Sequence, residues 1–206
     1  MKKVGLKTPL TRGDVEGLRC GDEVYFTGHV FTCRSRFHIR AIDEEETPPI
    51  DFARYNVMFH VGPIVERLNE EWRVVCATPT MSPRFSKWTE EAIRRFGLKA
   101  IIGKGGFPGL SEVFKRHGCV YLIGVGNWAG ALYADRIKRV KEVHWLDLGL
   151  PEALWVLEVE NIGPFILEID SRGNSLYDDL SEEIDENIRR VEKARGFEGF
   201  QYTSFD

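Results

Sequence analysis

Residues 98–126, LKAIIGKGGFPGLSEVFKRHGCVYLIGVG, decide the fold class. Within them two apolar segments of strand length, 98–102 and 119–125, run into glycines, and a short helix is expected between them at 110–116. A strand, a short helix and another strand in so few residues are typical of a crossover between parallel strands. The sequence therefore predicts an α/β fold.

Further elements are expected on both sides of this segment. Residues 23–32, EVYFTGHVFT, carry apolar groups on both faces, which is typical of a strand inside a sheet. Trp88, Ala92 and Phe96 mark one face of a helix, with Ser86 as its cap. The remaining expected elements are a turn capped by Thr11, strands at 55–61, 73–78, 153–159 and 164–169, a helix at 129–140, and a helix at 180–195 whose apolar stripe, Ile184, Ile188 and Val191, docks at an edge of the domain.

Length and composition fit one globular domain. The chain has 206 residues, 43% of them hydrophobic, and 28 Lys+Arg against 32 Asp+Glu give a net charge of −4. These values argue against a disordered chain and against a nucleic-acid partner. Since there is neither an apolar run of about 18 residues nor an apolar leader, we expect a cytoplasmic protein without a membrane partner. We expect residues 1–177 to form the domain and residues 178–206 to add a C-terminal helix and tail.

The four cysteines are expected to be reduced and mostly buried thiols. They lie far apart in the sequence and show neither C-x-x-C nor C-x-x-H spacing. No closed zinc or iron-sulfur site is therefore expected within this chain, and no metal ligand is assigned to it. The cysteines are Cys20, Cys33, Cys76 and Cys119.

Three loops that follow predicted strands present groups able to hold a carboxylate. Arg34 lies in the first loop, Thr80 and Arg84 lie in a proline-bounded turn, and Lys104 lies in the glycine loop 103–106. Ligands of open α/β sheets collect outside the carboxyl ends of strands, so these loops can converge on one pocket. Arginine grips a carboxylate with two hydrogen bonds and lysine adds a point charge. The combination suits a small dicarboxylate, although each side chain taken singly is also typical of a surface ion pair or a turn.

A second glycine pattern offers an alternative function. Residues 124–129, GVGNWA, fit G-x-G-x-x-A between a predicted strand and a predicted helix, with Asp147 about 20 residues on, as in dinucleotide-binding sites. The ring of Trp128 stands where a pyrophosphate-binding turn needs small residues, and close packing of helix on strand is the other explanation of the glycines. Among the five histidines only His38 is a candidate site residue, because it lies near Arg34.

Short motifs along nearly the whole chain occur in the order seen in one known family. They are Gly21-Asp22-x-Val24-Tyr25 with Gly28, Arg34 with His38, Gly62-Pro63, Pro79-Thr80-x-Ser82-x-Arg84, Ile102-Gly103-Lys104-Gly105-Gly106 and Trp155-x-x-Glu158-Val159-Glu160. With these motifs the chain resembles the β subunit of two-subunit class I fumarases and L-tartrate dehydratases, which is similar to the C-terminal domain of single-chain class I fumarases. The resemblance implies a swivelling β/β/α domain with a mixed sheet and flanking helices.

The resemblance also implies a reaction and a partner. The reaction is the reversible dehydration of a 2-hydroxy dicarboxylate, first of all malate to fumarate as in the tricarboxylic acid cycle, with L-tartrate or another hydroxy acid as the alternative. The enzyme would be a hydro-lyase that is active only with an α subunit, in a heterotetramer. A 4Fe-4S cluster would be held by that α subunit and none by this chain, and its open iron would bind the substrate as a Lewis acid.

Residue roles follow from the resemblance in the same way. Thr80 and Lys104 are the expected catalytic residues, and the expected substrate-binding residues are Arg34, His38, Ser82, Arg84 and Lys104. The chain departs from the family pattern at Ser35, at Arg36-Phe37 and at Asn127-Trp128, which would reshape the pocket for a different hydroxy acid. A non-catalytic carboxylate-binding module is the remaining alternative.

Overall fold

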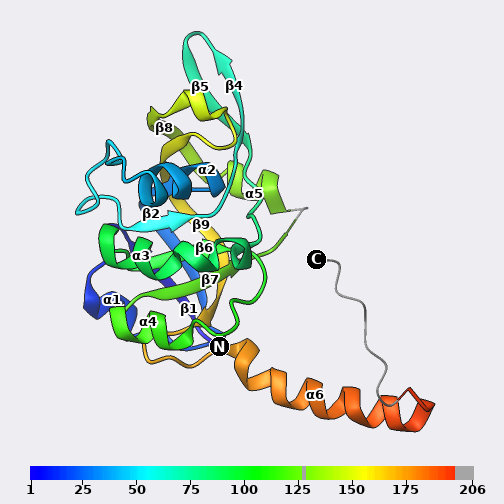
Figure 1. Ribbon diagram of the computed structural model, residues 1–206. Helices are drawn as coiled ribbons and strands as arrows, with labels where there is room; N and C mark the ends of the chain where they lie inside the picture. The colour runs from blue at the N-terminus through cyan, green and yellow to red at the C-terminus, as the bar shows by residue number, and fades with distance from the viewer. Residues whose placement is uncertain (127–128, 198–206) are drawn as a thin grey trace.

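The computed structural model describes residues 1–126 and 129–197, and its centre is a seven-stranded mixed sheet in the order β1-β2-β3-β6-β7-β9-β8 (Figure 1). The first five of these strands run parallel, and β9 is antiparallel to its neighbours. Because β9 pairs with β2 as well as with β7, the strands between them close into a ring. The bounds are β1 Lys3–Lys7, β2 Glu23–Thr32, β3 Val57–Phe59, β6 Ala100–Gly103, β7 Val120–Gly124, β8 Ile137–His144 and β9 Leu154–Ile169.

Both faces of the parallel strands β2, β3, β6 and β7 are largely buried, as their apolar composition predicts, whereas β1 at the edge is mostly exposed. In β2, Val24 and Phe26 belong to one core cluster and Phe31 belongs to the other. In β6, Ile101 and Ile102 likewise belong to different core clusters, one on each face of the sheet. A strand that buries both faces can stand only in the interior of a sheet, so the sequence of β2 explains its position between β1 and β3. The expected α/β fold with a mixed sheet and flanking helices is confirmed.

The helices cover the sheet on both sides. Thr11 caps α1 with a capping box completed by Asp14, as predicted. Helix α3 buries Trp88, Ala92 and Phe96, also as predicted, but Ser86 is not its cap: a 3-10 turn leads directly into the helix, and the Ser86 hydroxyl donates to the carbonyl of Pro83. The helical segments are α1 Arg12–Glu16, α2 Ser35–His38, the π-helical turn Ile39–Asp43, the 3-10 turn Ser82–Phe85, α3 Ser86–Phe96, α4 Ser111–His117, α5 Gly130–Ala134, the 3-10 turn Leu146–Leu148 and α6 Leu176–Arg195.

The helix expected over residues 129–140 is wrong in its second half. Helix α5 has five residues, and β8 begins at Ile137. The apolar side chains Ile137, Val140 and Val143 recur every third residue, which imitates a helix in the sequence. Irregularities in the pairing of β8 with β9 fall between Ile137 and Arg139 and between Val140 and Glu142, and each adds one residue to the strand. The strand therefore returns its apolar side chains to the core with a period of three.

Two further segments differ from expectation. The strand predicted at 73–78 exists as β5, Glu71–Cys76, but it pairs with β4, Ile64–Leu68, in a separate ribbon that projects from the body (Figure 1). Helix α6 also projects from the body, and the side chains of Ile184, Ile188 and Val191 are 50%, 49% and 56% exposed. The expected docking of this stripe on the domain is therefore wrong. None of the described helices is long and apolar enough to span a membrane.

Candidate functional site

The carboxyl ends of β2, β3 and β6 lie side by side, because these strands are parallel neighbours in the sheet. Backbone hydrogen bonds then join the proline-bounded turn that carries Thr80 and Arg84 to this edge. The amide of Thr80 donates to the carbonyl of His60 at 2.7 Å, and the amide of Lys104 donates to the carbonyl of Thr80 at 3.1 Å. The amide of Ser82 in turn donates to the carbonyl of Lys104 at 3.0 Å. Thr80 and Lys104, both predicted as site residues, are thus joined by one series of backbone hydrogen bonds, from His60 through Thr80 and Lys104 to Ser82, which we call the backbone ladder.

Lys104 and Thr80 keep their side-chain polar groups free of described protein partners. The Lys104 side chain is partly buried and lies along Gly126, where an added Cβ would come within 3.1 Å of its Cδ. No carboxylate in residues 1–126 or 129–197 forms an ion pair with it, and the Thr80 hydroxyl makes no hydrogen bond to that part of the chain. An ammonium without a carboxylate partner and a hydroxyl without a partner, on residues whose backbones are bonded to each other, are suited to an anionic ligand.

Arg34 follows β2 and lies across Gly62. A Cβ at Gly62 would stand 2.6 Å from the carbonyl oxygen of Pro151 and 2.7 Å from Nη1 of Arg34, so glycine leaves room for the guanidinium beside a backbone that cannot move aside easily. Nε of Arg34 lies 3.5 Å from Oε1 of Glu152, which holds one side of the guanidinium. The Gly62-Pro63 motif therefore has a steric role in placing this cation.

Ser82 and Arg84 belong to the same loop but face different surroundings. Ser82 is fully buried, and its Oγ lies 2.8 Å from Nδ1 of His60. Arg84 is exposed, with its guanidinium carbon 5.9 Å from the ring of Phe85. The backbone places Arg84 two residues from the Lys104 ladder, whereas the Ser82 side chain points into the interior.

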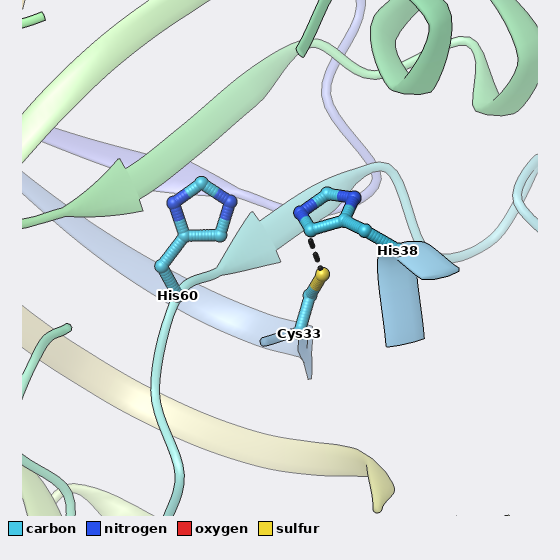
Figure 2. Close-up of side chains that lie close together, drawn as sticks. All are labelled: Cys33, His38 and His60. Carbon is cyan, nitrogen blue, oxygen red and sulfur yellow. Dashed lines mark hydrogen bonds between the residues drawn. The ribbon is translucent and has the colours of Figure 1, made fainter. Parts of the chain in front are cut away.

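His38 is buried in a cluster with Cys33 and His60, as Figure 2 shows. Its Nε2 lies 3.1 Å from Sγ of Cys33, and its ring stacks on Trp88 at 5.3 Å. Burial lowers the pKa of His38 to about 3 and that of His60 well below its usual value, and burial raises the pKa of the Cys33 thiol. Both imidazoles are thus neutral, and His38 is shielded from a ligand in solution.

Sequence reasoning missed this cluster because its members do not lie together in the chain. Cys33 and His38 are 5 residues apart, and His60 belongs to a different segment, after the next strand of the sheet. The available signal is their place in the topology: Cys33 directly follows β2 and His60 directly follows the neighbouring β3. Nδ1 of His38 and Nε2 of His60 are buried without a hydrogen-bond partner among the described residues. Each such nitrogen costs about 1–3 kcal/mol of stability when nothing binds it.

The glycine pattern 124–129 is explained by packing. A Cβ at Gly124 would lie 2.8 Å from Cγ of Pro79, and Gly126 lies against Lys104. Residues 127 and 128 are outside the described part of the chain. Helix α5 is only five residues long, and the acidic residue that would bind a ribose, Asp147, forms an ion pair with Arg40. The geometry therefore offers little support for a dinucleotide.

The cysteines do not suit a 4Fe-4S cluster in this chain. Such a cluster needs several thiolates around one point. Within the described residues, the one group of three or more His, Cys, Asp and Glu that could hold a metal ion contains a single cysteine, Cys33. Cys119 is fully buried elsewhere, in the core beside β7.

Glu168 supports the glycine loop from behind and yields a prediction. Its Oε1 accepts hydrogen bonds from the Ser175 hydroxyl at 2.7 Å and from the amide of Tyr177, whose ring lies against Gly106. Oε2 has no partner in the described chain, and burial raises the pKa of this carboxyl. In the unfolded chain the Glu168 carboxyl loses its proton above about pH 4, whereas in the folded chain it keeps the proton up to its raised pKa. The free energy of unfolding therefore falls as the pH rises from about 4 to this raised pKa.

From pH 4 to pH 8 the wild type should accordingly lose more in melting temperature than Glu168→Gln, because the glutamine does not titrate. Thermal unfolding at both pH values measures this shift. Glu183→Gln, at an exposed position of α6, is the control and should show no such shift. Equal differences at the two pH values for Glu168→Gln would contradict the prediction.

Comparison with known proteins places this site in a family. Residues 1–180 match the family model described as the fumarase C-terminus. A Methanocaldococcus jannaschii protein, whose name assigns it to the β subunits of L(+)-tartrate dehydratase, is 40% identical over 187 residues, 88% of this chain and 95% of that protein. The L(+)-tartrate dehydratase subunit beta of Escherichia coli is 38% identical over 180 residues, 85% of this chain and 87% of its own length. A Geobacillus stearothermophilus protein named for class I fumarate hydratase is 34% identical over 86% of this chain and 34% of that protein. The resemblance read from the motifs is confirmed, and the chain belongs to the fumarase C-terminus family.

Proposed function

We propose that this chain is the β subunit of a hydro-lyase that reversibly dehydrates a 2-hydroxy dicarboxylate at a site shared with an α subunit. The observation that carries the proposal is Lys104, whose backbone is hydrogen-bonded to Thr80 and Ser82 and whose ammonium has no acidic partner in the described chain. The names of the relatives support the dehydratase reaction class, and the words subunit beta in those names support a partner subunit.

The cations of this chain would bind and polarise the substrate carboxylates. Removal of a proton next to a carboxylate builds negative charge on that carboxylate. Arg34 is held by Glu152 and the backbone of Lys104 by its hydrogen bonds, so these two cations, together with the exposed Arg84, would favour the transition state over the ground state. Arg34 would act through the side of its guanidinium that Glu152 does not hold.

Thr80 would hold or relay the transferred proton at its Oγ. Its backbone amide and carbonyl both form hydrogen bonds, to His60 and Lys104, which fix the main chain while leaving the hydroxyl free of described partners. A threonine hydroxyl is a weak base alone, so this role requires a neighbouring group on the α subunit. In our proposal that subunit holds a 4Fe-4S cluster, which supplies Lewis-acid chemistry when bound, and the assembly is a heterotetramer.

L-tartrate and malate are the two candidate substrates. The relatives named for L(+)-tartrate dehydratase are 37–40% identical to this chain and the one named for class I fumarate hydratase is 34% identical, so both acids have support from a relative's name. The motifs of the site are equally compatible with malate, because both acids present two carboxylates.

Co-expression of this chain with its α subunit under anaerobic conditions tests the proposal. We expect the complex to release oxaloacetate from L-tartrate, fumarate from malate, or both, and neither subunit alone to do so. Turnover by the isolated chain, or a cluster-loaded complex that acts on no 2-hydroxy dicarboxylate, would contradict the shared-site proposal. The ratio of kcat/KM for the two acids identifies the preferred substrate.

A further inference from the structure

Cys33, His38 and His60 place one soft and two borderline donor atoms around a common point. Their candidate ligand atoms all lie within 4.8 Å of one another, with Cys33 Sγ and His38 Nε2 at 3.1 Å. In Figure 2 the thiol and the two rings face one another from separate backbone segments. Each side chain is 1% exposed, so the group is closed to bulk solvent.

The hydrogen bonding of His60 prepares it as a ligand. Its Nδ1 lies 2.8 Å from Oγ of Ser82, and its Nε2 is buried without a partner among the described residues. When Nδ1 carries the proton and donates it to Ser82, Nε2 holds a free lone pair. A second-shell contact of this kind fixes the tautomer in metal-binding histidines.

Outside the cluster, these donor atoms have one weak contact among the described residues, from Cys33 Sγ to the carbonyl oxygen of Arg34 at 3.7 Å. The surrounding surface is aromatic, with Trp88 stacked on His38 and Phe85 at 4.6 Å from the ring of His60. An aromatic wall around these donor atoms lowers the local dielectric constant, which strengthens binding of a cation to a thiolate and two imidazoles.

We propose that Cys33 Sγ, His38 Nε2 and His60 Nε2 bind one Zn²⁺ ion. In tetrahedral zinc sites the Zn–S distance is about 2.3 Å and the Zn–N distance about 2.0 Å, which sets S and N about 3.5 Å apart. The observed 3.1 Å needs to widen by only a few tenths of an ångström. As the Zn–S bond forms, the S–H bond of Cys33 breaks and its proton passes to water, with no change of oxidation state. A water molecule completes the fourth position.

This site is independent of the proposed hydro-lyase function, but it would act on the same loop. Ser82 joins His60 through its side chain and Lys104 through its amide, so an ion that fixes His60 also fixes Ser82. The zinc would therefore stabilise the loop that carries Thr80 and Arg84. It would be a structural ion, because the ring of His38 and the thiol of Cys33 are closed to substrate.

Titration of the chelator-treated full chain with Co²⁺ and Zn²⁺ tests the proposal. We expect one equivalent of Co²⁺ to give the intense thiolate-to-cobalt charge-transfer band, Zn²⁺ to displace it, and Zn²⁺ to raise the melting temperature. Cys33→Ser should abolish the charge-transfer band and weaken the affinity for Zn²⁺ at least 100-fold. Cys119→Ser, at an equally buried cysteine outside the cluster, should leave both unchanged.

His60→Gln is the second variant, in case Cys33→Ser does not fold. It keeps the thiol, so we expect the charge-transfer band to remain visible only at higher Co²⁺ concentrations, with an affinity weaker by at least about 10- to 100-fold, the loss caused by removing even an outer-shell partner of a ligand. The proposal would be overturned if the folded wild-type chain bound no stoichiometric metal. It would equally be overturned if His60→Gln or Cys33→Ser bound Zn²⁺ as tightly as the wild type.

Discussion

Lys104→Met should lower kcat/KM of the assembled enzyme by about 100- to 1000-fold, the loss typical of removing one preorganised group that stabilises a developing anion. Methionine keeps the length and the apolar contact of the stem with Gly126 but removes the charge. The backbone amide and carbonyl of residue 104 still complete the ladder with Thr80 and Ser82, so folding and assembly should be unchanged. Steady-state kinetics of the complex with L-tartrate and malate measure the loss.

Lys99→Met is the matched control for this prediction. Lys99 directly precedes β6, and Lys104 directly follows it, so the two lysines stand at opposite ends of one strand. The amide of Lys99 donates to the carbonyl of Asn56, which is also a backbone contact that the substitution keeps. We expect Lys99→Met to retain wild-type kcat/KM. Wild-type turnover in Lys104→Met would remove Lys104 from the site, and an equal loss in both variants would indicate a general effect of charge.

The position of the loops could be predicted from the sequence because parallel strands are recognisable. The runs around β2 and β6 are apolar on both faces, and residues that follow such strands collect at one edge of the sheet. That argument places Arg34 and Lys104 at the same edge of the sheet, after β2 and β6, which have β3 between them. It cannot decide where a side chain points: Ser82 and His38 carry polar groups that the sequence cannot distinguish from exposed ones, yet both are buried.

The parts of the fold that could not be predicted depend on pairing between distant segments. Local periodicity makes β8 resemble a helix, and only its irregular pairing with β9 explains the spacing of Ile137, Val140 and Val143. The cluster of Cys33 with His60 is hidden for the same reason, since β2 and β3 become neighbours through tertiary structure alone. Sequence spacing reports metal ligands when they share one element, and these donors come from three segments.

Gly103→Ala should destabilise the fold by about 3 kcal/mol, because it overpacks a rigid part of the site. A Cβ at this position would meet Ser82 Oγ 1.8 Å away and the Tyr121 hydroxyl oxygen 3.2 Å away. Ser82 has a short side chain, is fully buried and is bonded to Nδ1 of His60, so it cannot move aside without leaving that nitrogen unpaired. For a chain of this size the melting temperature should fall by roughly 6–12 °C.

Gly5→Ala provides the control for the same chemical change in a strand. Gly5 lies in β1, and a Cβ there would meet no atom within 4 Å, so this variant should be as stable as the wild type or about 0.5 kcal/mol more stable. The double variant Gly103→Ala with Ser82→Gly removes the atom that causes the main clash. Denaturant unfolding should show it to be less destabilised than the sum of the two single variants. If the losses in free energy of unfolding were additive, the cost of Gly103→Ala would arise from backbone effects and not from contact with Ser82. Gly103 would then have no packing role towards the loop that carries Thr80.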